Sequence, residues 1–287
     1  MSGCEIPPKK PDIPLARIGP AGRTGREPTD VNLLLPGLAS AYLLTFARVG
    51  TLVMLMPGIG EAMVSPRLRL AFALLLSLVL FPVARPLLPG GAGPEPGGAG
   101  TALIGVLIGE IAVGLVLGLS VRAIVAALQT AGTIIAQQLG LAFAMTVDPS
   151  VGNQQATLGS FLSLLGLTLV LAADLHHLAL MAIRDSYALM PPVGMPATGD
   201  AAAFAVRAIA RSFTLSVQIA APFIAFGILF NLGLGVLSRL MPQMQVFFVA
   251  TPASIMIGML VLLATVGVIM GVFVDDLGRF LADLGRA

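Results

Sequence analysis

The stretch "GVLIGEIAVGLVLG", residues 105–118, decides the kind of fold that this chain can adopt. It is apolar throughout except for one carboxylate, Glu110, and it holds two pairs of glycines, each spaced four residues apart. Successive residues of a helix turn by about 100°, so the first pair would lie opposite the second pair, Gly114 and Gly118. The pattern predicts a membrane helix that packs closely against neighbours on two faces.

The composition of the whole chain agrees with this stretch. Its 287 residues are 57% hydrophobic and 10% charged, and the mean hydropathy is +0.97. Soluble domains carry about 25% charged residues, so we expect an integral membrane protein or part of a membrane complex. The 16 basic and 14 acidic residues gather in the N-terminal tail and between apolar runs, so the basic balance is no evidence for nucleic-acid binding. The single cysteine, Cys4, excludes an internal disulfide and a thiolate metal cluster.

Apolar runs long enough to span a bilayer follow a proline-rich start. Residues 1–30 hold six prolines and no apolar stretch, which predicts a disordered tail, or a tail left unmade if translation begins near Val31. A span needs roughly 20 apolar residues, and an all-α fold of such helices is predicted. The runs lie at 38–56, 70–88, 101–121, 123–147, 156–180, 213–238 and 246–273.

Two further patterns bear on the arrangement of these runs. The run at 123–147 carries three glutamines and is a poor lipid-facing span, so a simple serpentine topology is not established. Beyond the last run, apolar residues recur at helical spacing and predict an amphipathic C-terminal helix, either at an interface or as a solvated helix end. These residues are Leu277, Phe280, Leu281 and Leu284.

Charged side chains inside apolar runs are costly and mark candidate functional positions. Arg48, in "YLLTFARVG", and Glu110 are the two clear cases. They could form a salt bridge with each other, or pair with charges of a partner subunit, and so serve assembly. A direct role in transport is the alternative.

The only two histidines of the chain are adjacent, in "AADLHHLAL". Neighbouring helical positions point about 100° apart, so we expect that His176 and His177 do not chelate one metal together. Asp174 and His177 are three residues apart and can meet on one helix face, which predicts a hydrogen-bonded structural pair, with a proton-carrying site as the alternative.

Catalytic and cofactor motifs are absent from the sequence. There is no zinc-protease motif, nucleophile elbow, nucleotide-binding loop or dinucleotide fingerprint. We therefore expect no enzyme activity, no cofactor and no metal. A proton-coupled secondary transporter using Glu110 and Asp174 is an alternative, although no internal repeat supports it. An intramembrane hydrolase built on Asp174 and His177 is a second.

Several stretches together resemble the FliR family, the R subunit of the flagellar type III secretion export gate. The similarity runs from Leu38 to Leu277, and these stretches are specific in their order and spacing. They are "FARVGTLVMLMPGIGEAMVSPRLRLAFAL" at 46–74, "GEIAVGLVLGL" at 109–119, the segment 129–180, "SYALMPPVG" at 186–194, and "APFIAFGILFNLGLGVLSRLMPQMQVFFVATP" at 221–252. Gln245 stands where the family commonly has asparagine.

The resemblance implies a non-enzymatic, single-copy subunit that resembles a fusion of the P-type and Q-type export-gate subunits. It implies a P-like region at 31–199 and a Q-like hairpin with a C-terminal helix at 200–287. The implied partners are those two subunits, membrane proteins of the FlhB and FlhA type, and unfolded flagellar substrates. The implied location is the bacterial inner membrane at the flagellar basal body. The injectisome counterpart, the SctT-type subunit, is the alternative.

The resemblance also implies a role for one stretch in which polar residues interrupt the apolar runs, "LGLAFAMTVDPSVGNQQ" at 139–155. In the family, the matching segment projects into the pore and helps to plug it, here near residues 140–153. Apolar side chains can form a dry constriction, whereas Asp-Pro breaks a helix and glycine permits unusual backbone angles. The implied plug residues are Phe143, Met145, Asp148, Pro149 and Gly152.

Two other sets of residues receive roles. Arg48 and Glu110 would stabilise the helix assembly. Arg239, Pro242 and Gln243 would shape the turn of the final hairpin.

Overall fold

The computed structural model describes residues 29–61, 64–87, 99–141, 154–190, 198–240 and 246–284. Within these ranges every element is a helix: α1 (Thr29–Leu55), α2 (Pro66–Ala84), the short 3-10 helix η1 (Arg85–Leu87), α3 (Ala99–Gln138), α5 (Gln154–Ala172), α6 (Leu175–Leu189), α7 (Thr198–Leu240) and α8 (Val246–Leu284). The predicted all-α fold is confirmed.

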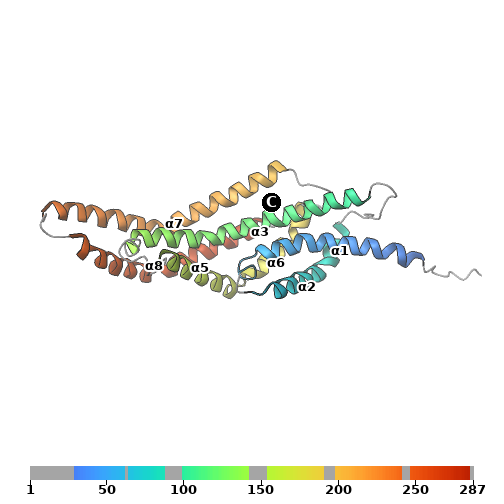
Figure 1. The fold of residues 1–287 in the computed structure, drawn as a ribbon, viewed down its shortest axis with the longest axis horizontal. Helices are drawn as coiled ribbons and strands as arrows, with labels where there is room; N and C mark the ends of the chain where they lie inside the picture. Colours follow the sequence, from blue (N-terminus) through green and yellow to red (C-terminus); the bar gives the residue numbers. More distant parts are fainter. Residues whose placement is uncertain are drawn as a thin grey trace, which may run out of the picture.

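The helices form an elongated bundle arranged around α3 (Figure 1). α3 packs against α1, α5 and α7, while α2 packs on α1 and α8 packs on α7 and α6. The far ends of α7 and α8 project together beyond the end of α3, at the left of Figure 1.

The three longest helices exceed the thickness of a bilayer. α3, α7 and α8 have 40, 43 and 39 residues, and at about 1.5 Å per residue each is roughly 60 Å long. The hydrocarbon core of a membrane is only about 30 Å thick. Five helices of the described residues are long and apolar enough to cross a membrane, or six if the bent pair α5–α6 counts as one span.

Two boundaries differ from those predicted. The run at 101–121 and the described run that follows it, from 123 to Gln138, belong to one continuous helix, α3. The run at 156–180 is broken between Ala172 and Leu175, where α5 and α6 meet at a bend of 76°. Asp174 causes this break, because its φ of 56° is left-handed and cannot continue a right-handed helix.

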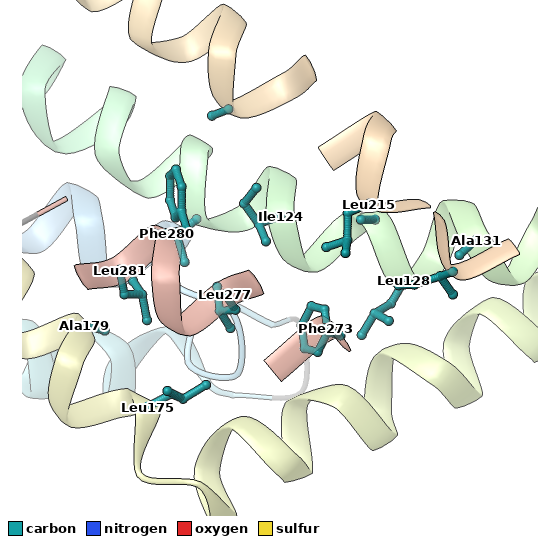
Figure 2. Packing of buried hydrophobic residues seen from close by; sticks show 14 of the residues in the cluster. Ile124, Leu128, Ala131, Leu175, Ala179, Leu215, Phe273, Leu277, Phe280 and Leu281 are labelled. Carbon is teal, nitrogen blue, oxygen red and sulfur yellow. The ribbon is translucent and has the colours of Figure 1, made fainter. Parts of the chain in front are cut away.

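The predicted amphipathic C-terminal helix is the last part of α8, not a separate element. Its apolar residues pack inside the chain: Leu277, Phe280, Leu281 and Leu284 are all buried in the core. Figure 2 shows this part of α8 lying between α3 and the α5–α6 pair, with Phe280 near Ile124 and Phe273 near Leu128. This face is therefore part of the core of the chain, and neither of the two predictions, an interface or a solvated helix end, describes it.

α3 supplies the centre of that core. Ile124, Leu128, Ala131 and Ile135 are fully buried and recur on one face of the helix. This stripe faces residues of α8 and α7 (Figure 2).

Candidate functional site

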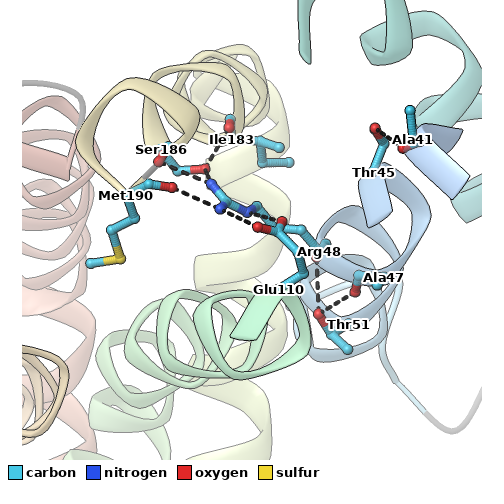
Figure 3. Close-up of polar contacts among 9 residues, drawn as sticks. All are labelled: Ala41, Thr45, Ala47, Arg48, Thr51, Glu110, Ile183, Ser186 and Met190. Atoms are coloured by element: carbon cyan, nitrogen blue, oxygen red, sulfur yellow. Dashed lines mark hydrogen bonds and ion pairs between the residues drawn. The ribbon is translucent and has the colours of Figure 1, made fainter. Parts of the chain in front are cut away.

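A buried ion pair lies at the junction of α1, α3 and α6. Arg48, on α1, is 0% exposed and Glu110, on α3, is 2% exposed. The guanidinium donates from Nε to Glu110 Oε2 at 2.6 Å and from Nη2 to Oε1 at 2.9 Å, a bidentate arrangement (Figure 3). The predicted mutual salt bridge is therefore present, in the geometry that gives such pairs their strength.

Arg48 also binds the C-terminal end of α6. Its Nη1 donates to the carbonyl oxygen of Ser186 at 3.0 Å, and Nη2 donates to the carbonyl oxygen of Met190 at 2.8 Å. The last carbonyls of a helix lack partners within the helix, and a cation there also suits the helix dipole. The guanidinium lies 4.1 Å from the ring centroid of Tyr187, so the aromatic face covers its remaining side.

Two glycines of α3 permit this close junction. A Cβ at Gly114 would overlap Thr51 Oγ1 and lie 2.6 Å from the carbonyl oxygen of Arg48, and one at Gly118 would lie 2.8 Å from Leu55 Cβ. The second glycine pair of the sequence thus packs against α1, as predicted for a close helix contact. Gly105, from the first pair, has nothing within 4 Å in this chain.

A second polar anchor, which the sequence did not single out, joins α7 to α8. Arg211 donates from Nε to both carboxylate oxygens of Asp276, at 3.1 Å each, and its Nη1 lies 3.7 Å from Asp283 Oδ2. Ser212, next to it, donates from Oγ to the carbonyl oxygen of Ala123 on α3 at 2.6 Å. The only signal in the sequence was an arginine within one long apolar helix, α7, and acidic residues near the end of another, α8.

The plug residues named from the sequence, Phe143, Met145, Asp148, Pro149 and Gly152, lie outside the described residues. The two helices that flank them are described. A Cβ at Gly132 of α3 would overlap Gly159 of α5, so the two backbones touch near this end of the pair. Ser254 of α8 donates to the carbonyl oxygen of Leu139 at 3.1 Å. The segment 142–153 is therefore carried by a closely packed and anchored helix pair.

The proposed hairpin turn between α7 and α8 is described only in part. Arg239 lies in the last turn of α7 and is exposed. Pro242 and Gln243 lie outside the described residues.

Asp174 and His177 lie near each other, but without the expected hydrogen bond. His177 Nδ1 is 3.7 Å from Asp174 Oδ1, which is too far. The expectation that His176 and His177 point apart is wrong: their ring centroids are 4.1 Å apart, at the start of α6 that follows the left-handed Asp174.

Comparison with known proteins identifies the family. The model of the family described as "Bacterial export proteins, family 1" matches residues 39–280. The chain belongs to this family. Its relatives include the flagellar biosynthetic protein FliR of Caulobacter vibrioides, 45% identical over 81% of this chain and 90% of the relative. Those of Bacillus subtilis and Escherichia coli are 30% and 29% identical, over 81% and 76% of this chain and 88% and 80% of their own.

These export proteins confirm the resemblance to the FliR family read from the sequence. The match includes the junction at Arg48, the α5–α6 bend, and the pair Arg211–Asp276 between α7 and α8. The flagellar names of these relatives do not favour the injectisome alternative. The proton-coupled transporter also gains no support, because the Glu110 carboxylate is buried and held by both of its oxygens.

Proposed function

We propose that this chain is the single-copy R-type subunit of the flagellar type III export gate, where it helps to form and to plug the channel for unfolded flagellar substrates. The observation that carries the proposal is the match to a family of bacterial export proteins over residues 39–280, by a membrane protein with long uncovered apolar helices. The role is that of a channel component without enzyme activity.

Uncovered apolar side chains on three helices support assembly with other subunits. Large apolar residues are exposed along α2, the outer half of α7 and α8. Among the most exposed are Leu68, Val79, Leu229, Leu240 and Leu263. A membrane can cover about 30 Å of a helix, which is half the length of α7 or α8, so the rest of these faces needs protein. The partners proposed are the P-type and Q-type subunits, with FlhB- and FlhA-type membrane proteins beside them.

A cleft with charged residues at the middle of α3 supports the inference that part of this chain lies outside the bilayer. Arg122 is exposed there and, together with Glu61, Gln129 and Ser163, lines a cleft of about 630 Å³. An arginine in hydrocarbon is costly and normally faces protein or water. We infer that this part of α3 lies outside the lipid core or against a wet cavity, in an assembly that stands partly beyond the inner membrane at the flagellar basal body.

The division into two regions follows the same proposal. Residues 31–199 would be the P-like region, which includes the ion-pair junction and the plug-bearing helices α3 and α5. Residues 200–287 would be the Q-like region, and the α7–α8 hairpin accounts for nearly all of it. Residues 1–30 lie outside both.

The segment near 140–153 would plug the resting channel. Its position between the ends of α3 and α5 supports this, because a seal needs a rigid base: Gly132 meets Gly159, and Leu139 is held by Ser254. Phe143 and Met145 would supply the dry constriction, and Asp148, Pro149 and Gly152 would shape the loop that presents them.

Removal of residues 143–152 tests the plug directly. We expect the membrane ion leak of cells that carry the complete gate to rise, because a hydrophobic constriction that blocks water and ions is lost. The leak is measured as membrane depolarisation and as conductance of the purified gate in planar bilayers. A matched control deletes ten residues from another inter-helix connection, 89–98. Equal conductance in the two deletions and the wild type, with normal assembly, would refute the plug.

A further inference from the structure

The bend between α5 and α6 holds a carboxylate that has no structural partner of the usual kind. Asp174 is the N-cap residue of α6, a position where aspartate normally accepts a hydrogen bond from the first turn. Here its side chain makes no such bond, and the backbone is left-handed at φ 56°. The side chain is 76% exposed. Since a non-glycine residue in this conformation costs energy, the position calls for a compensating interaction.

Two imidazoles face this carboxylate. His177 Nδ1 lies 3.7 Å from Asp174 Oδ1, and His176 Nε2 lies 4.0 Å from the same oxygen. One donor atom can be chosen from each of the three residues so that all lie within 4.8 Å of one another. Three potential ligand atoms, two from imidazoles and one from a carboxylate, thus lie close together at the bend.

These separations suit a transition metal better than a hydrogen-bonded cluster. Zinc binds histidine nitrogen and carboxylate oxygen at about 2.0–2.2 Å, which in a tetrahedron places neighbouring ligand atoms about 3.4 Å apart. The observed distances exceed this by less than 1 Å for two of the three pairs, within reach of small side-chain rotations. They are too long for direct hydrogen bonds. Two imidazoles and one carboxylate also select zinc over magnesium or calcium, which prefer oxygen ligands.

The hydrogen bonding of His176 is also incomplete. Within the described part of the chain, its Nδ1 is buried without a hydrogen-bond partner, and its Nε2 has Asp174 at 4.0 Å as its polar neighbour. A ring with neither nitrogen bonded is unusual for a half-buried side chain. The base of the bend is fixed, because Leu175 is buried and packs against the backbone of α8 at Gly278.

We propose that Asp174, His176 and His177 bind one divalent transition-metal ion, with zinc preferred, that fixes the bend between α5 and α6. The metal would connect the left-handed residue before α6 to the first turn of that helix. The outward side of the site stays open, so water or a side chain of a neighbouring subunit would complete the coordination. The proposal concerns a cation site and stands whether or not the segment 142–153 plugs a channel.

Metal content and cobalt absorption test this site. The full chain is purified in mild detergent with an affinity tag that contains no histidine, in a Cys4→Ser background that removes its one thiol. After equilibration with zinc and removal of free ion, we expect one zinc per chain by elemental mass spectrometry. Replacement of zinc by cobalt should give the strong visible absorption of a tetrahedral site with nitrogen ligands.

Two variants and a matched control complete the experiment. His177→Ala and His176→Ala should each lower zinc affinity by about tenfold or more, while Asp200→Asn, which removes an exposed carboxylate at the start of α7, should not. Zinc should raise the unfolding temperature of the wild type and of Asp200→Asn only, with helical content by circular dichroism unchanged in all. No bound zinc in the wild type, octahedral cobalt absorption, or retention of zinc by both histidine variants would overturn the proposal.

Discussion

Arg48 determines how three helices meet. Its guanidinium contacts the carboxylate of Glu110 and two carbonyl oxygens at the end of α6, while Tyr187 covers its face. A buried ion pair is not by itself a source of net stability, because both charges lose their hydration. It instead fixes the relative positions of α1, α3 and α6, since only one placement of the three helices lets Arg48 make all of these contacts.

Loss of Arg48 alone should be severe. In Arg48→Met the Glu110 carboxylate stays buried without its partner, and we expect the free energy of unfolding to fall by about 3–5 kcal/mol. The measurement is denaturation of the purified chain in mixed detergent micelles, followed by circular dichroism.

The double variant Arg48→Met/Glu110→Leu is the control for this interpretation. It should recover most of the lost stability, because no uncompensated charge remains, and should keep a deficit of about 1 kcal/mol from the carbonyl of Met190, which loses its bond to Arg48. A double variant no more stable than Arg48→Met would show that the loss does not come from the unpaired charge of Glu110.

At the scale of elements, glycines fix the distance between α3 and α5. A Cβ at Gly132 would overlap the backbone of Gly159, and one at Gly159 would lie 2.7 Å from the side-chain amide nitrogen of Gln129. Backbone atoms cannot give way as a side-chain end can. The two helices that carry the segment 142–153 are therefore closer to each other than any other residue type would allow.

Gly132→Ala and Gly105→Ala form a matched pair that tests this contact. Alanine is the better helix former by up to about 1 kcal/mol, so Gly105→Ala, with open space around it in the isolated chain, should be neutral or stabilising. Gly132→Ala should instead destabilise by about 1–3 kcal/mol through overpacking. Thermal unfolding of both variants in one detergent decides the matter, and equal melting temperatures would contradict the close crossing.

The sequence predicted the presence of the helices better than their ends, and α3 shows why. Three glutamines made 123–147 a poor span by itself, which favoured a separate element. In the structure Gln129 accepts a hydrogen bond from Ser163 at 3.3 Å, and Gln138 packs against Gly227 of α7. Their polarity serves contacts with other helices, and a single-segment pattern contains no information about those contacts.

The bend at Asp174 was also not predicted from the sequence. The residues around it, "LAADLHH", contain no glycine or proline, the residues that usually indicate a helix break. Aspartate is one of the few residues besides glycine that adopt the left-handed region, but this property is recognised only when the backbone is seen. By contrast, Arg48 and Glu110 were found at once, because a charge in an apolar run has few explanations.

At the scale of the whole molecule, the chain alone leaves its longest surfaces uncovered. The outer half of α7 is exposed at nearly every position from Asn231 to Leu240, and the hairpin it forms with α8 extends past the rest of the bundle (Figure 1). A soluble monomer rarely exposes so much contiguous apolar surface. Lipid and partner subunits must share it, and the length of the helices requires that partners cover a large part.

The composition of the complex tests this account most directly. The chain, tagged and expressed with the neighbouring genes of its own organism, is extracted in mild detergent and measured by native mass spectrometry. We expect one copy of this chain bound to several copies each of two smaller helical membrane proteins of the P and Q types. A stable monomer or homodimer without partners would contradict the proposed role as a subunit of the export gate. Glu110 would then be the first residue to test for proton-coupled transport.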